Sequence, residues 1–194
     1  MKRWLLYAAL VATVNIGQFT AAHADWDAKH LKLVRGSPTS LRQAVQTAER
    51  ELKGRAYSAV AIAGEDAVSF TVKVFVAEKA LATQVDGKTG KLVGSPSALS
   101  ESPALLKDFL KIKGTLLAAA KAAEATAKGK AFQALFKRSN TKLLFEVDVA
   151  GRDDIEKDVV IDATSGKIRK VAERAADTGG SASVAQPAGV APAQ

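Results

Sequence analysis

The sequence predicts an α+β fold of two tandem repeats, each with one helix packed on a three- to four-stranded antiparallel sheet. Three observations lead to this prediction. A stretch with helical spacing of apolar residues is followed by stretches in which apolar and polar residues alternate, which is typical of a helix followed by antiparallel strands. The same order of patterns occurs twice along the chain. Each copy closes with a similar turn motif, which begins with Asp and ends with Gly-Lys.

This turn motif is the most distinctive repeated feature. Its first copy is Gln84-Val-Asp-Gly-Lys-Thr-Gly-Lys91 and its second is Val160-Ile-Asp-Ala-Thr-Ser-Gly-Lys167. Aspartate suits the start of the turn because its carboxylate can accept hydrogen bonds from backbone N–H groups two residues further on. Glycine suits the end of the turn because it adopts a positive φ without a Cβ clash. Two such turns, each after a similar block, indicate an internal duplication.

Residues 1–24 have the pattern of a signal peptide. Lys2 and Arg3 precede an apolar stretch from Trp4 to Val14, and Ala22-His23-Ala24 supplies the small residues of a cleavage site. The apolar stretch is too short to span a bilayer. We therefore expect cleavage after Ala24, a periplasmic protein, and no transmembrane span in the mature chain.

The composition argues against several kinds of enzyme. The chain has no Cys and two His, and removal of residues 1–24 leaves only His30. Cys–His catalysis and zinc sites with several Cys or His ligands are therefore excluded. No glycine-rich phosphate loop follows a predicted strand. We expect a protein without catalytic residues or a bound cofactor, and we expect His30 to be a solvated residue in an irregular segment over residues 25–39.

The charge of the chain points to acidic partners or anionic surfaces. The formal net charge of +8 falls to +6 when Lys2 and Arg3 are removed. A nucleic-acid partner is not expected, because the protein is predicted to be exported and because the basic residues between Lys107 and Lys142 lack interleaved aromatic side chains. The simplest interpretation of this basic stretch is a solvated helix face.

The first repeat is predicted over residues 40–94. Ser40 and Gln43 form a capping box, and the apolar residues that follow are spaced as on one face of a helix over Leu41–Lys53. Gly54 stands where a glycine that ends a helix belongs. Alternating apolar residues then predict the antiparallel strands.

The second repeat is predicted over residues 115–174 and matches the first at a constant offset, which one extra residue in the turn at 151–154 shifts by one. Residues 95–114 are predicted to be a linker with a short amphipathic helix. Residues 175–194 are poor in charge and have no aromatic residue, so we expect a disordered tail. The predicted cores are Leu41, Val45, Ala48, Phe70, Val72 and Val74 in the first repeat, and Leu116, Ala119, Ala123, Phe145, Val147 and Val149 in the second.

The order of helix, glycine, strands and a final Val-Asp-x-x-Thr-Gly-Lys motif resembles the PepSY domain, here in two tandem copies. The resemblance implies an extracytoplasmic, non-catalytic module. Members of this family occur in the propeptides of thermolysin-like proteases, where they are associated with inhibition, and as free-standing secreted proteins. The residues that carry the resemblance are Val85, Asp86, Thr89, Gly90 and Lys91, and in the second copy Ile161, Asp162, Ser165, Gly166 and Lys167.

One charged feature of the second repeat is not required by the repeat pattern, because the matching positions of the first repeat are not acidic. Strand alternation places four carboxylates on the outward face of two adjacent strands. Clustered carboxylates suit a hard cation such as Ca²⁺. The alternative is that Lys137 and Lys142 neutralise them, since flat strand surfaces wrap an ion less well than loops do. These four candidate metal ligands are Glu146, Asp148, Glu156 and Asp158.

Two functions are therefore weighed. The first is a non-catalytic periplasmic module that binds a protein or peptide and regulates it, with a peptidase among the candidates. The second is a periplasmic cation-binding protein that uses the four carboxylates of the second repeat. The sequence leaves open the oligomeric state and whether the repeats pack face to face or form one continuous sheet.

Overall fold

The computed structural model describes residues 26–153 and 155–174, so the predicted signal peptide and the predicted tail lie outside the described residues. The α+β prediction is confirmed: each repeat folds into one helix and four antiparallel strands. Repeat 1 consists of α2 (Leu41–Leu52), β1 (Arg55–Ala63), β2 (Val68–Val76), β3 (Lys79–Asp86) and β4 (Leu92–Leu99). Repeat 2 consists of α4 (Leu116–Ala127), β5 (Gly129–Ser139), β6 (Lys142–Gly151), β7 (Glu156–Asp162) and β8 (Ile168–Arg174).

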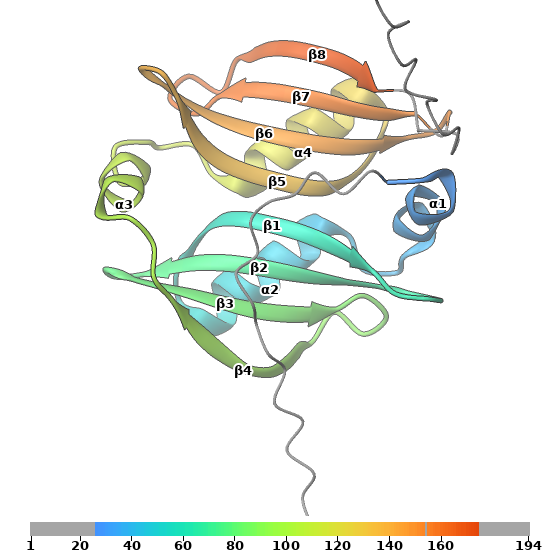
Figure 1. The fold of residues 1–194 in the computed structure, drawn as a ribbon, viewed down its shortest axis with the longest axis horizontal. Coiled ribbons are helices and arrows are strands. Elements are labelled where there is room, and N and C mark those ends of the chain that lie inside the picture. The colour runs from blue at the N-terminus through green and yellow to red at the C-terminus, as the bar shows by residue number, and fades with distance from the viewer. Residues whose placement is uncertain (1–25, 154, 175–194) are drawn as a thin grey trace, which may run out of the picture.

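All eight strands form one antiparallel sheet in the order β4-β3-β2-β1-β5-β6-β7-β8, and α2 and α4 pack on the same face of it (Figure 1). The opposite face is called the helix-free face below. Every residue predicted for the two cores is buried between the helices and the sheet. The helices also contact each other, and an ion pair of 2.7 Å joins Arg42 Nε on α2 to Glu124 Oε2 on α4.

The two repeats join through the pairing of β1 with β5. Ala59 lies opposite Ala134, and the offset between these two residues is the one that also relates Leu41 to Leu116. Equivalent positions of the two repeats therefore face each other, and their neighbours pair reciprocally on either side. This is the geometry of an isologous interface, with a local two-fold axis between the two alanines.

Each repeat ends its helix in the same unusual way. Lys53 and Lys128 adopt the left-handed conformation, with φ of 53° and 54°. Gly54 does follow the end of the helix, as expected, but the left-handed residue is the lysine before it. Gly54 and its equivalent Gly129 are needed for space, because a Cβ atom on either would collide with a carbonyl oxygen of the neighbouring strand.

The first strand of each repeat contains a β-bulge that turns an aromatic side chain out of the regular alternation. The bulges fall at Tyr57 in β1 and at Phe132 in β5. A short helix or its flanking residue covers each ring: Tyr57 contacts Phe109 of α3 (Pro103–Phe109), and Phe132 contacts Trp26, which precedes α1 (Ala28–Gly36). The short helices therefore complete the cores at the two ends of the β1–β5 junction, as Figure 1 shows for their positions.

Two parts of the chain differ from expectation. His30 lies in the regular helix α1 and not in an irregular segment, because Asp27 caps this helix by accepting a hydrogen bond of 2.9 Å from the His30 N–H, and Leu31 and Val34 bury its inner face. Strand β4 continues to Leu99, past the expected end of the first repeat at residue 94. Pro96 is compatible with this strand because β4 is at the edge of the sheet.

Substitution of the glycine that follows a long helix tests whether the neighbouring strand leaves room for a Cβ atom there. We expect Gly54→Ala to lower the free energy of unfolding by about 1–3 kcal/mol, because the added methyl group must displace backbone and core atoms. Chemical denaturation measures this change. Gly36→Ala is the matched control, since no atom lies within 4 Å of the added Cβ there. Equal stability of the two variants would contradict the steric explanation.

Candidate functional site

The repeated turn motif serves as a structural corner in both repeats. Asp86 Oδ1 accepts hydrogen bonds from the backbone N–H and the hydroxyl of Thr89, at 2.7 and 2.8 Å. Asp162 Oδ1 accepts the same two bonds from Ser165, at 2.8 and 2.9 Å. These bonds to Thr89 lower the pKa of Asp86, and for Asp162 an added bond from Arg169 lowers the pKa further. Both carboxylates are thus held in the turn.

The four predicted metal ligands form one cluster on the helix-free face of β6 and β7, as the strand alternation predicted. Asp148 lies directly opposite Asp158, and the two glutamates flank them diagonally. The cluster is much less exposed than expected for an outward face: Glu146, Asp148 and Glu156 keep only 7%, 2% and 4% of their surface accessible. We call these four residues the acidic cluster.

Basic and amide side chains on both sides hold three members of the acidic cluster. Lys137 forms an ion pair with Glu146, as one of the two sequence-based alternatives proposed. Arg174 Nη1 lies 2.6 Å from Glu156 Oε1. Gln133 Nε2 donates a hydrogen bond of 2.7 Å to Asp148 Oδ2. The contribution expected from Lys142 was wrong, because Lys142 makes no ion pair within the described part of the chain.

The pair formed by Asp148 and Asp158 is under-compensated. The Oδ1 atoms of both residues are buried and accept no hydrogen bond from the described residues. Burial, followed by the negative charges of Glu156 and Asp158, raises the pKa of Asp148 to about 7. Asp148 is therefore the residue that carries a proton below neutral pH, and this proton removes the repulsion across the two strands. Among residues 26–153 and 155–174, no three His, Cys, Asp or Glu side chains are grouped so that they could hold a metal ion.

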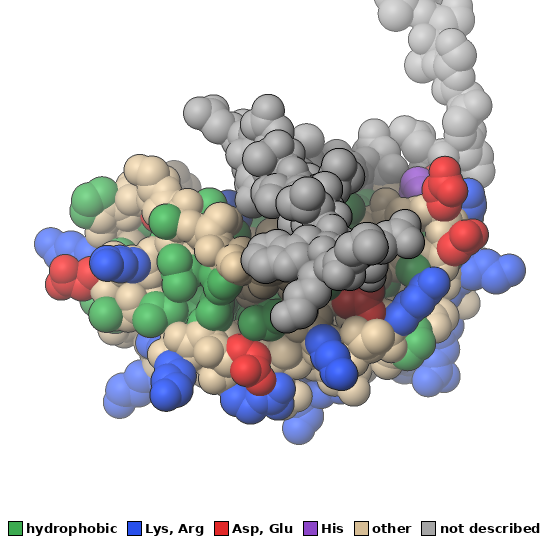
Figure 2. Space-filling model, turned by 90° about the horizontal axis from the view of Figure 1, so that it is seen from below, with side chains coloured by type: hydrophobic (Ala, Val, Ile, Leu, Met, Phe, Trp, Pro, Cys, Tyr) green, Lys and Arg blue, Asp and Glu red, His purple; other side chains and the backbone are tan. Residues whose placement is uncertain are grey.

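Within the described residues, β4 and β8 are the two edge strands of the sheet, and each pairs with a strand on one side only. Both expose apolar side chains: Val93 of β4 is 49% exposed, and Ile168 and Val171 of β8 are 40% and 46% exposed. Figure 2 looks onto the molecule from the β4 side and shows hydrophobic side chains gathered there among scattered Lys and Arg. Sequence reasoning identified the strands but not these edges, because strand order cannot be read from periodicity.

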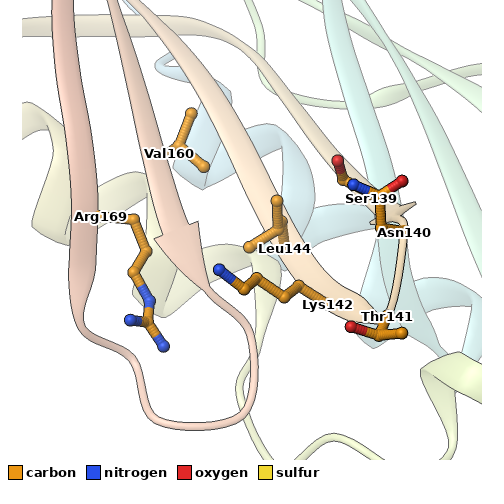
Figure 3. Close-up of a pocket in the computed structure, with 7 residues that line it drawn as sticks. All are labelled: Ser139, Asn140, Thr141, Lys142, Leu144, Val160 and Arg169. Atoms are coloured by element: carbon orange, nitrogen blue, oxygen red, sulfur yellow. The ribbon is translucent and has the colours of Figure 1, made fainter.

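A shallow pocket of about 340 Å³ lies between the β5–β6 hairpin and the start of β8 (Figure 3). Two basic residues, Lys142 and Arg169, line it from different strands. Arg169 Nη2 is fixed by a contact of 2.7 Å with Asp162 Oδ2, whereas Lys142 has no such partner in the described residues. The pocket also presents the polar residues Ser139 and Thr141, so its lining can donate hydrogen bonds to a small anionic group.

The raised pKa of Asp148 predicts a stability change near neutral pH. An aspartate has a pKa of about 3.9 when unfolded. Between this value and about 7, the folded state binds more protons, so the free energy of unfolding falls as the pH rises through this window and levels off above it. Asp148→Asn removes the titration. We expect the stability of the variant relative to wild type to grow from pH 5 to about pH 7, by about 1.4 kcal/mol for each pH unit, and to change little from there to pH 8.

Denaturant unfolding at the two pH values measures this difference. Asp66→Asn is the control, because Asp66 lies exposed in the turn between β1 and β2. If wild type and Asp148→Asn had the same stability at both pH values, the buried and protonated state of Asp148 would be contradicted.

A crystal structure of a candidate lipoprotein from Clostridium difficile 630 aligns with 73% of this chain and 97% of its own, at 14% sequence identity and a TM-score of 0.43. No curated protein sequence matches the chain. None of the helices in the described residues has the length and apolar character needed to cross a bilayer.

The family comparison falls on repeat 2. Residues 115–172 match the model of the PepSY family, described as "Peptidase propeptide and YPEB domain". The matched residues run from α4 to the middle of β8 and include the acidic cluster, the second turn motif and the exposed Ile168 and Val171. Repeat 2 of this chain is therefore a PepSY domain.

Proposed function

We propose that this protein is an exported, non-catalytic module that binds a periplasmic protein or peptide and regulates it, with a peptidase as the first candidate partner. The signal-peptide pattern of residues 1–24 supports export. The PepSY match of residues 115–172 supports a module of the type found in peptidase propeptides. The choice of a peptidase rests on this family likeness, and the binding role rests on the structure of β8.

The observation that carries the proposal is the open edge of β8. An edge strand presents a row of unpaired backbone N–H and C=O groups, to which an extended segment of another chain can pair. On β8 this row is flanked by Ile168 and Val171, two large apolar side chains that are 40% and 46% exposed. Backbone pairing together with apolar burial is a recognition mode that needs no catalytic group.

Cation binding by the acidic cluster is the second candidate. It is favoured by one observation: the Oδ1 atoms of Asp148 and Asp158 are buried on adjacent strands without hydrogen-bond partners. Three observations weigh against it. Lys137 and Arg174 already pair with the two glutamates, Asp148 holds a proton near neutral pH, and no described group of three ligands converges. We therefore place this function second.

Inhibition of a protease tests the first candidate. We expect the purified exported protein to slow the hydrolysis of a fluorogenic peptide by thermolysin in a saturable manner. A dissociation constant in the micromolar range corresponds to a binding free energy of about −8 kcal/mol. The control is an unrelated folded protein at the same concentration, and calorimetry with active thermolysin checks direct association. Full activity at saturating protein, with no heat of binding, would remove the peptidase from the proposal.

Thermal unfolding with added Ca²⁺, Mg²⁺ or Zn²⁺ tests the second candidate. An ion that binds only the folded state adds about 2.7 kcal/mol at one hundred times its dissociation constant. We expect no shift of the midpoint at millimolar concentrations, because the raised pKa of Asp148 and the two ion pairs of the glutamates reduce the negative charge of the acidic cluster. A shift that is lost in the double variant Asp148→Asn/Asp158→Asn would establish the cation site instead.

A further inference from the structure

The two open edges of the sheet are not equivalent. β4 contains Pro96, which has no N–H group to donate, and Gly94 with a φ of +71°. Both features interrupt the regular row of backbone groups that an added strand would need. β8 contains neither proline nor glycine over Ile168–Arg174. The edge with the longer uninterrupted stretch for another strand is therefore β8, over Lys170–Arg174.

The register with β7 assigns the side chains of β8 to the two faces of the sheet. Ile168 and Val171 lie opposite buried residues of β7, so both point to the face that carries the helices. Lys170 and Arg174 point to the helix-free face. A strand added beside β8 would find apolar neighbours on one face and basic neighbours on the other.

The charges along β8 are only partly compensated. Arg174 is paired with Glu156, and Glu173 lies 3.5 Å from Lys157, so both already have partners. Lys170, in the middle of the strand, has no ion-pair partner among the described residues. Its positive charge is free to interact with a residue of an added strand.

The pocket beside the start of β8 extends this basic character. Arg169 occupies a β-bulge in β8 and lines the pocket together with Lys142, as Figure 3 shows. A carboxylate on an added strand can reach this pocket from the open edge, where Lys142 and the hydroxyl groups of Ser139 and Thr141 are available as donors. Asp158 lies next to Ala172, so the favourable positions for acidic residues are beside Lys170 and Arg169 and not beside Ala172.

We propose that β8 is a strand-addition site for an extended acidic peptide segment in which acidic and apolar residues alternate. The acidic side chains face Lys170 and the pocket at Arg169, and the apolar side chains cover Ile168 and Val171 on the other face. A second copy of the chain is a poorer occupant, because two β8 strands side by side would bring two sets of basic residues to one junction. This inference rests on the proposed binding function and names the chemistry of the partner.

The test uses a fluorescent, end-blocked peptide of alternating Glu and Val, and a matched peptide of alternating Lys and Val. We expect the acidic peptide to bind the exported protein, as measured by fluorescence anisotropy, and the basic peptide not to bind. In two-dimensional NMR spectra, the shifts caused by the acidic peptide should concentrate on the amides of β8. Slowed hydrogen exchange of those amides would report the new backbone hydrogen bonds.

Charge-reversal variants test whether the acidic peptide binds at β8 or elsewhere on the basic surface. Lys170→Glu should weaken binding of the acidic peptide by roughly tenfold, since attraction becomes repulsion at the central contact. Lys91→Glu is the control, because Lys91 is exposed and directly precedes β4 at the opposite edge of the sheet. Circular dichroism checks that both variants are folded. If a variant does not fold, the hydrogen-exchange measurement on the wild-type protein still tests the site.

Three outcomes would overturn the inference: no binding of the acidic peptide, equal binding of the basic peptide, or amide shifts on β4 or on the interior strands. Inhibition of thermolysin without binding of the peptide to β8 would leave the proposed function in place and remove this site. Binding at β8 without inhibition would retain the site and remove the peptidase.

Discussion

The structure depends on the short antiparallel pairing between β1 and β5. Only through this pairing do two four-stranded units become one sheet, and its register decides how the helices meet. Ala59 and Ala134 lie at its centre, completely buried, and their small side chains leave room for α2 and α4 to approach each other above them. Larger residues at either position would push the helices from the sheet and from each other.

The same junction explains several contacts that look unrelated along the sequence. Arg55, at the start of β1, donates a hydrogen bond of 3.1 Å to the Gly114 carbonyl, just before α4. Lys130, its equivalent in β5, donates one of 3.1 Å to the Ser37 carbonyl, just before α2. Each repeat therefore fixes the segment that leads into the helix of the other. The two halves support each other symmetrically, and neither is simply appended to its neighbour.

Much of this fold could be predicted from local patterns. The helix of repeat 1 was predicted to begin at the capping box of Ser40 and Gln43, and the structure contains both hydrogen bonds of that box. The alternation in β2 and β6 identified core residues that are indeed buried. The roles of Gly54 and Gly129 could not be predicted, because they depend on a carbonyl oxygen of another strand. Residue type indicated a helix end at these positions, and only tertiary contact shows why glycine is required.

The candidate site was predicted to a lesser extent. Alternation correctly placed the acidic cluster on one face, because the side-chain period of a strand is fixed by its geometry. It could not show that Asp148 is buried or that Gln133 and Arg174 would contact the cluster, because these depend on which strands are neighbours. The basic and apolar faces of β8 were invisible for the same reason. Strand order, which is a long-range property, determines both sites.

The unequal edges of the sheet also determine how many molecules can join. A protein with two open edges can add a neighbour on each side, and repeated addition produces a filament of unlimited length. In this chain Pro96 interrupts the β4 edge, while β8 contains no proline and is regular over Lys170–Arg174. If strands add only at β8, as proposed above, growth by edge pairing stops after one addition, and the complex is expected to be one-to-one. Duplication within a single chain makes this possible, because a symmetric dimer of identical halves would have two identical edges.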